Sequence, residues 1–168
     1  MKYKEYKEKL EKDRLRYGEA GHIKLYIKNA GYKIVTNLRR CEYLRGKKIF
    51  FPIYQLQRVK YHRLCVKYGC DIPSHVKIGA GFKLDHPVGV VINSKAIIGE
   101  NFNIKSGAVI GKTEKGVAKI GDNVMVGVHA LIIGNVTIGD DAKIGAGAIV
   151  THDAGEGATV ISPCAHER

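Results

Sequence analysis

The sequence predicts a mainly β fold, in which a short α-helical cap precedes a left-handed parallel β-helix of hexapeptide repeats. The main observation is a six-residue rhythm of aliphatic side chains that begins at Asp71 and continues to about Ala154. Gly or Asp usually follows the aliphatic residue, as in "IGDNVM" and "IGDDAK". The residues before Asp71 lack this rhythm and show helical spacing with a strong basic excess. Self-similarity at a fixed short period is typical of solenoids whose coils stack on one another.

The aliphatic positions of the repeat are expected to form the core of the β-helix. Each coil turns three corners in about eighteen residues, so one aliphatic side chain per face points inward and stacks on the next coil. Gly, Asn and Asp suit the corners, where positive φ or local side-chain hydrogen bonds are needed. The predicted core positions are Ile72, Ile78, Leu84, Val90, Ile92, Ile98, Ile104, Ile110, Ile120, Val126, Ile132, Ile138, Ile144 and Val150.

The first seventy residues are expected to form three helices. The first lies in "YKEYKEKLEKDRLRYG", where opposite charges alternate at i,i+4 and Gly18 marks the stop. The second spans Ile23–Leu44, with Gly31 as a plausible break. The third, in "FPIYQLQRVKYHRLCVKYG", begins near Pro52 and closes at Gly69. Its expected buried stripe is Ile53, Leu56, Val59, Tyr61, Leu64 and Tyr68.

The basic charge divides the chain into unequal parts. Residues 1–70, the basic helical cap, carry 19 Lys/Arg and 6 Asp/Glu, which gives a net charge of +13. The remainder consists of the β-helix domain, residues 71–155, and a tail, residues 156–168. It carries 9 Lys/Arg and 10 Asp/Glu, a net charge of −1, so the total for the chain is +12. Such an excess can attract nucleic acid, membrane phosphates or an anionic cofactor. Because no aromatic–basic nucleic-acid motif accompanies it, solvated helix faces are expected, with no nucleic-acid partner.

The expected location is the cytoplasm, without stable membrane insertion. No apolar run approaches the length of a membrane span, and the lysine-rich start lacks a signal-peptide core. Cys41, Cys65, Cys70 and Cys164 show no zinc or disulfide spacing, which fits buried thiols in a reducing compartment. A β-helix of four to five coils buries little core by itself, so a homotrimer or a dimer of trimers is expected.

Candidate chemistry is concentrated where the helices give way to the β-helix, in "GCDIPSHVKIGAGFKLDHPVGVVI". Fourteen residues separate Asp71 from Asp85, close to one coil, so Asp71 is expected near His86 in the adjoining layer. A carboxylate beside an imidazole fixes its tautomer and stabilises the imidazolium, as a general base for a hydroxyl requires. The residues alone leave a second interpretation open, namely a corner Asp and an incidental surface His.

At these residues the chain resembles the serine acetyltransferases of the hexapeptide-repeat acyltransferase superfamily. "DIPSHVKIGAGFKLDHPVGVV" is similar to that family's D-I-H-P segment followed by L-D-H, and the resemblance continues over roughly residues 69–155. It implies acetyl transfer from acetyl-CoA to an acceptor hydroxyl, without a metal. In that resemblance His86 is the general base, Asp71 its orienting partner and Asp85 an acceptor-binding carboxylate. No acyl-enzyme is implied, so no cysteine needs to act as nucleophile.

The same resemblance implies where acetyl-CoA lies, in the groove between neighbouring β-helices. Lys112, Lys115 and Lys119 are candidates for the CoA phosphates, although each is equally an ordinary exposed corner residue. His129 fits a corner filler better than a second catalytic imidazole. The positions implied to contact the cofactor are Gly111, Lys112, Thr113, Val128, His129 and Ala146.

The chain also departs from the family pattern, and the departures affect the acceptor. The loop "GKTEKGVAKI" is about four residues shorter than in serine acetyltransferases, and Gly116 and Val117 replace the Arg-His pair that holds serine there. A basic residue of the cap is a possible substitute. The tail keeps Pro163 but lacks the usual Gly-x-Pro-Ala-Lys/Arg. Short proteins of this pattern also resemble acetyltransferases of surface-polysaccharide pathways, so a sugar hydroxyl is the alternative acceptor.

Two other classes of function fit the fold less well. A zinc enzyme such as a γ-class carbonic anhydrase needs three converging histidines. The β-helix offers His75, His86, His129 and His152, but not in that family's spacing. That class also leaves Asp85-His86 unexplained, and a non-catalytic β-helix scaffold or binding module is the other alternative.

Overall fold

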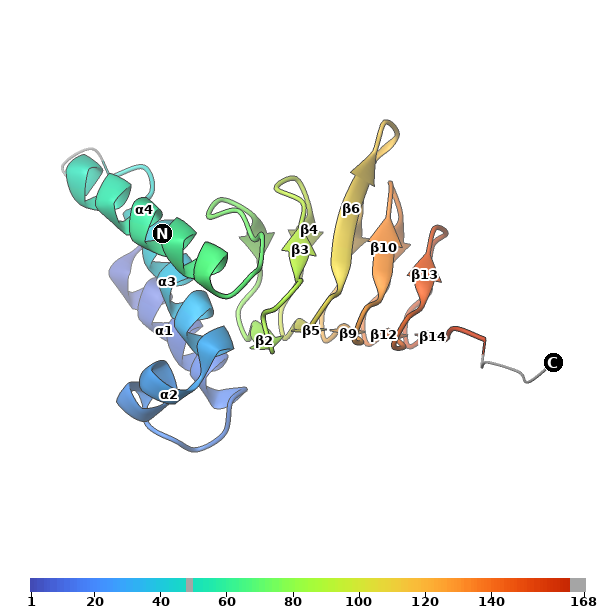
Figure 1. Ribbon diagram of the computed structural model, residues 1–168, viewed down its shortest axis with the longest axis horizontal. Helices are drawn as coiled ribbons and strands as arrows, with labels where there is room; N and C mark the ends of the chain where they lie inside the picture. Colours follow the sequence, from blue (N-terminus) through green and yellow to red (C-terminus); the bar gives the residue numbers. More distant parts are fainter. Residues whose placement is uncertain (48–49, 164–168) are drawn as a thin grey trace.

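The computed structural model describes residues 1–47 and 50–163, where four helices precede a parallel β-helix (Figure 1). The predicted fold class is therefore confirmed. The helices are α1 (Tyr3–Leu15), α2 (His22–Lys28), α3 (Ala30–Leu44) and α4 (Phe51–Lys67). The strands are β1 (Lys77–Ile78), β2 (Lys83–Asp85), β3 (Val91–Ile92), β4 (Ile97–Ile98), β5 (Asn103–Lys105), β6 (Val109–Thr113), β7 (Gly116–Val117), β8 (Lys119–Ile120), β9 (Met125–Val126), β10 (Leu131–Ile133), β11 (Thr137–Ile138), β12 (Lys143–Ile144), β13 (Ile149–Val150) and β14 (Thr159–Val160).

Three parallel sheets form the three faces of the β-helix. Their strand orders are β1-β4-β8-β11, β13-β10-β6-β3 and β14-β12-β9-β5-β2. Leu131 pairs with Ile149, eighteen residues further on, as the hexapeptide period requires. Val109 pairs with Leu131 at a spacing of twenty-two, because an antiparallel hairpin of β6 and β7 is inserted in that coil.

The core of the β-helix consists of the residues that the repeat predicts. Every predicted position from Ile72 to Val150 is at most 4% exposed, and the small residues between them, such as Ala130 and Ala142, are also buried. Phe82 and Phe102 stack at successive corners with ring centroids 5.9 Å apart. The stacked aliphatic side chains hold the coils together through continuous apolar contact.

The second predicted helix is in fact two helices, α2 and α3, and the break is not at Gly31. Asn29 adopts an extended conformation between them, and its side chain accepts a hydrogen bond from the Tyr32 N–H at 2.8 Å. This N-cap interaction begins a new helix at Ala30. Gly31 lies inside α3 because the helix presses against the Leu84 carbonyl there, and a Cβ would overlap that oxygen.

The prediction for α4 is right about its ends but only half right about its buried stripe, since Tyr61, Leu64 and Tyr68 pack against the core as predicted. Pro52 lies in its first turn, and Gly69 follows it with φ of +62°. However, the predicted core residues Ile53, Leu56 and Val59 are 53%, 72% and 50% exposed. The face that packs against the rest of the protein consists of Tyr54, Gln57, Tyr61, Leu64, Cys65 and Tyr68. The error arose because α4 carries apolar side chains on both faces, and spacing alone does not distinguish them.

A buried ion pair joins the helical cap to the first coil. Asp13 of α1 and Arg39 of α3 are 0% and 1% exposed, and they form two hydrogen bonds of 2.7 and 3.1 Å. Asp13 also accepts the Phe82 N–H at 2.8 Å, while Arg39 donates to the carbonyls of Ile78 and Gly79. The pair therefore satisfies backbone groups at the outer edge of the first coil, where no further coil continues the sheets.

Tyr17 makes a second contact of this kind, beside β2. Its hydroxyl accepts the Leu84 N–H at 2.7 Å. Burial raises the pKa of Tyr17, so the hydroxyl stays protonated at neutral pH. Leu84 immediately precedes Asp85 and His86, so the cap determines the path of the chain into that corner.

The described thiols are buried or partly buried, as expected. Cys41 and Cys65 are buried, Cys70 is partly buried, and all three are unpaired, whereas Cys164 lies outside the described residues. Burial raises the pKa of Cys41 to about 11. Within residues 1–47 and 50–163, no helix is long and apolar enough to cross a membrane.

Candidate active site

The turn that contains His86 belongs to one edge of the β-helix, between the β2 sheet and the β3 sheet. Four turns stack along this edge, at residues 86–89, 106–107, 128–129 and 146–147, and we call it the His86 edge. Backbone hydrogen bonds of 2.8–2.9 Å connect successive turns, from the N–H of one to the carbonyl of the turn before. The donors are Gly107, His129 and Gly147.

The His86 turn is longer than the others on this edge. Eight residues separate the starts of β2 and β3, whereas six separate most neighbouring strands. His86 has φ of +53° and an exposed side chain, and positive φ is uncommon for residues other than glycine. Asp85 is half-buried and lies 3.5 Å from the Lys83 ammonium. A histidine held in this way is accessible to a reactant, and strain of this kind is frequent at functional sites.

Asp71 lies in the coil that precedes the strand after His86, but it is not bonded to the imidazole. It pairs with Val91 in a parallel bridge, and its N–H donates to the Val90 carbonyl at 2.8 Å. No hydrogen bond or ion pair joins Asp71 to His86 in the described part of the chain. The orienting role of Asp71 stays a prediction.

Asp71 lines a cleft of about 740 Å³ between the C-terminal half of α4 and the start of the β-helix. The cleft is also lined by Arg58, Arg63, His62 and His75, so its charged groups are mainly cationic. Neither Asp85 nor His86 lines this cleft. Of the three residues predicted for catalysis and acceptor binding, Asp71 is therefore the one that lines it.

The residues predicted to contact the cofactor fall into two groups. Val128, His129 and Ala146 are exposed and lie on the His86 edge. Gly111, Lys112 and Thr113 lie at the other end of the strands of the β3 sheet, where β6 ends and the β6–β7 hairpin starts. The outward side chains between the two groups are all apolar: Val91, Val109, Leu131 and Ile149.

No role was predicted for Ser106 and Gly107, which also lie on the His86 edge. The His129 imidazole covers Gly107, and a Cβ at that position would overlap the ring. His129, like His86, has positive φ, of +55°. The hexapeptide period could have identified Gly107. Gly107 holds the same position in its repeat as His129, immediately before the apolar residues of the next strand.

The shortened loop places no cation where the family's Arg-His pair would lie. Gly116 and Val117 form β7 and are half-buried against β6, and Lys112 and Lys115 near them are exposed. Lys119, the third lysine considered for CoA phosphates, lies in β8 on a different face. Arg58 and Arg63 are cations of the cleft that Asp71 lines.

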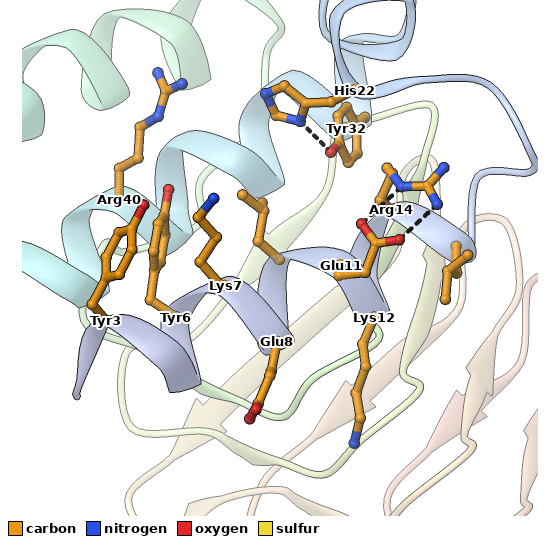
Figure 2. A pocket seen from close by; sticks show the side chains of 12 residues that line it. Tyr3, Tyr6, Lys7, Glu8, Glu11, Lys12, Arg14, His22, Tyr32 and Arg40 are labelled. Carbon is orange, nitrogen blue, oxygen red and sulfur yellow. Dashed lines mark hydrogen bonds and ion pairs between the residues drawn. The ribbon is translucent and has the colours of Figure 1, made fainter.

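Two further features lie outside this site. In residues 1–47 and 50–163, no three His, Cys, Asp or Glu side chains gather as a metal site would require. A hollow of about 870 Å³ lies on the cap between α1, α2 and α3, where His22 and Tyr32 share a hydrogen bond of 2.6 Å (Figure 2). None of the predicted site residues lines this hollow.

Comparisons with known proteins agree with this picture. Residues 118–152 match the family model described as bacterial transferase hexapeptide (six repeats). A serine acetyltransferase of Bacillus licheniformis is 39% identical over 97 residues, which cover 55% of this chain and 45% of the relative. Serine acetyltransferase 4 of Arabidopsis thaliana is 32% identical over 136 residues, covering 79% of this chain and 36% of the relative. The chain thus matches about half or less of the length of these relatives.

Solved structures match nearly the whole chain. Serine acetyltransferase isoform 3 of Entamoeba histolytica, in complex with cysteine, aligns with a TM-score of 0.80 at 26% identity. It covers 98% of this chain, which spans 60% of that structure. The Neisseria gonorrhoeae serine acetyltransferase in complex with serine aligns with a TM-score of 0.78 at 29% identity, covering 98% and 69%.

Proposed function

We propose that this chain, a hexapeptide-repeat protein homologous to the serine acetyltransferases, is an acetyl-CoA-dependent O-acetyltransferase that works by general-base catalysis. The observation that carries the proposal is the His86 edge. It aligns an exposed histidine, preceded by an aspartate, with three positions implied to contact the cofactor: Val128, His129 and Ala146. A reaction between a hydroxyl and a thioester needs such a base beside the thioester.

In the proposed mechanism His86 Nε2 takes the proton of the acceptor hydroxyl as the oxygen attacks the thioester carbonyl. Backbone N–H groups near the pantetheine stabilise the developing oxyanion, and the CoA thiolate leaves. Asp71 orients the imidazole, and Asp85 binds the amine or a hydroxyl of the acceptor through a charge-assisted hydrogen bond. No metal and no covalent intermediate take part.

The active site of the proposed enzyme lies between subunits of a homotrimer. Support comes from the outward face of the β3 sheet, where Val91, Val109, Leu131 and Ile149 expose an apolar column between the two groups of cofactor residues. An exposed column of this kind is stabilised when a second subunit covers it. Association through this face would form the groove for acetyl-CoA.

Serine is the acceptor that the comparisons favour, since the relatives are named for it. Its carboxylate needs a cation, and the shortened loop supplies none. We propose that Arg58 and Arg63 of α4 take this role, because they line the cleft that contains Asp71. Arginine binds carboxylates through two parallel hydrogen bonds, so either residue is suited to the task.

The test is a thiol-release assay with acetyl-CoA, L-serine and a panel of sugars. His86→Ala should lower kcat about 10²–10⁴-fold, the usual contribution of a general base, and leave CoA binding intact. His152→Ala is the matched control, because His152 is an exposed histidine of the β-helix away from the His86 edge. Near-normal turnover of His86→Ala would refute the assignment of the base. Activity with a sugar and none with serine would overturn the acceptor.

A further inference from the structure

The N-terminal half of α4 exposes an unusual concentration of large hydrophobic side chains. Phe51, Ile53, Leu56 and Val59 are 57%, 53%, 72% and 50% exposed within nine residues, and Phe50 before them is 39% exposed. The inner face of α4 is already packed against α3 and the first coil through other side chains. These outer residues therefore contribute nothing to the core of the protein.

The same helix is strongly basic. Arg58, Lys60, Arg63 and Lys67 are all exposed, and α4 contains no Asp or Glu. None of these four cations forms an ion pair with a described residue of the chain. Cations gather towards the C-terminal half, whereas the aromatic and aliphatic side chains gather towards the N-terminal half.

The helix α4 starts at one end of the molecule and runs from there towards the β-helix. Figure 1 shows the start of α4 at the end of the chain's fold opposite to β14, away from the strands of the β-helix. Ile53, Leu56, Lys60 and Lys67 share one side of α4, within about 60° by helical spacing, whereas Phe51 lies on the opposite side. These four residues do not line the cleft that contains Asp71, and we call them the α4 tip.

We propose that the α4 tip docks the protein onto a lipid bilayer that contains anionic lipid. The headgroup region of a bilayer accepts exposed apolar side chains, and anionic lipids attract nearby cations. Ile53 and Leu56 enter the headgroup region, while the long side chains of Lys60 and Lys67 reach the lipid phosphates. α4 lies on the surface and does not cross the membrane, which agrees with the absence of a spanning helix among the described residues.

Charge distinguishes this occupant from two others. If a second copy paired its own α4 with this one, the interface would place cations against cations, with no acidic residue of α4 to balance them. A nucleic acid would attract the cations, but its phosphates leave aliphatic side chains such as Leu56 without a partner. An anionic bilayer satisfies both halves of the surface.

The test measures binding of the full chain to sedimented vesicles of phosphatidylcholine, with and without phosphatidylglycerol. We expect binding only when phosphatidylglycerol is present, and a strong decrease at high salt because screening weakens charge attraction. Leu56→Glu should weaken binding more than tenfold. Replacing Lys60 and Lys67 by Ala should weaken it about fivefold for each cation. Ile161→Glu is the matched control, since Ile161 is 74% exposed at the far end of the β-helix, and it should bind normally.

A second readout follows insertion directly. The chain contains no tryptophan, so Ile53→Trp introduces a single indole at the α4 tip. Its emission should shift to the blue on vesicles with phosphatidylglycerol and remain unchanged on phosphatidylcholine alone. No binding to either vesicle would overturn the proposal, as would an equal loss of binding in Ile161→Glu. If Leu56→Glu lowers the sedimentation mass of the free protein, the surface is a subunit interface instead, and the proposal fails.

Discussion

Removing one partner of the Asp13–Arg39 pair should destabilise the protein more than any change at an exposed ion pair. Asp13→Ala leaves the fully buried guanidinium of Arg39 with the partly exposed Glu42 as its remaining counterion, and it removes the acceptor of the Phe82 N–H. Breaking a buried pair in this way costs about 3–5 kcal/mol. The lost hydrogen bond is part of that cost and is not added to it. Because domains are stable by about 5–15 kcal/mol, the loss is a large fraction of the total.

The assay is urea unfolding at one fixed protein concentration, since association also affects the apparent stability. Lys12→Ala is the control: Lys12 also joins α1 to the β-helix, through Glu100 at 3.0 Å, but both side chains are about half exposed. Its loss should cost about 1 kcal/mol or less. The double variant Asp13→Leu/Arg39→Met should recover most of the stability, because it leaves no unpaired buried charge. A cost for Asp13→Ala equal to that of Lys12→Ala would refute the reasoning.

Two further predictions concern the same region. Gly31→Ala should lower the free energy of unfolding in urea by about 1–3 kcal/mol, because the new Cβ overlaps the Leu84 carbonyl. Gly21→Ala should be nearly neutral, because a Cβ there meets nothing within 4 Å. Equal effects of the two changes would contradict the packing of Gly31 against Leu84. Burial acts to raise the pKa of Glu42, but Arg39 and Lys9 outweigh it and hold that pKa below the ordinary value of 4.5. The unfolded chain thus takes up this proton first, so the stabilisation is complete above pH 4.5 and is lost as the pH falls through the folded pKa. Glu42→Gln should flatten the acid limb of a stability–pH profile, and an unchanged limb would contradict this.

The β-helix was predictable because its determinants are local. Each aliphatic position, such as Ile104 or Ile132, faces inward for the same reason as its neighbours six residues away, and the coil repeats that geometry. The same regularity explains why Val128 and Ala146 fall on one edge: they are eighteen residues apart, which is one full coil. Periodicity fixed these positions without any knowledge of contacts between distant residues.

The cap was less predictable because its determinants are long-range. Asp13 lies in a helix whose charges resemble a solvated surface pattern, and nothing nearby in sequence reveals its partner Arg39, 26 residues away. The outer apolar side chains of α4 follow helical spacing as well as the inner ones do. The relation of Asp71 to His86 was equally out of reach, because it depends on the two extra residues in the His86 turn.

The contacts of the cap make it part of the candidate site, although the repeat begins only after it. β2 is the last strand of its sheet, so its N–H groups on the cap side have no neighbouring strand to pair with. Side chains of α1 and of the turn after it take that place, with Asp13 accepting from Phe82 and Tyr17 accepting from Leu84. Because Leu84 leads directly into Asp85 and His86, the position of the proposed base depends on groups nearly seventy residues earlier in the chain. A β-helix beginning at residue 71 would expose that edge to water and leave the His86 turn without its support.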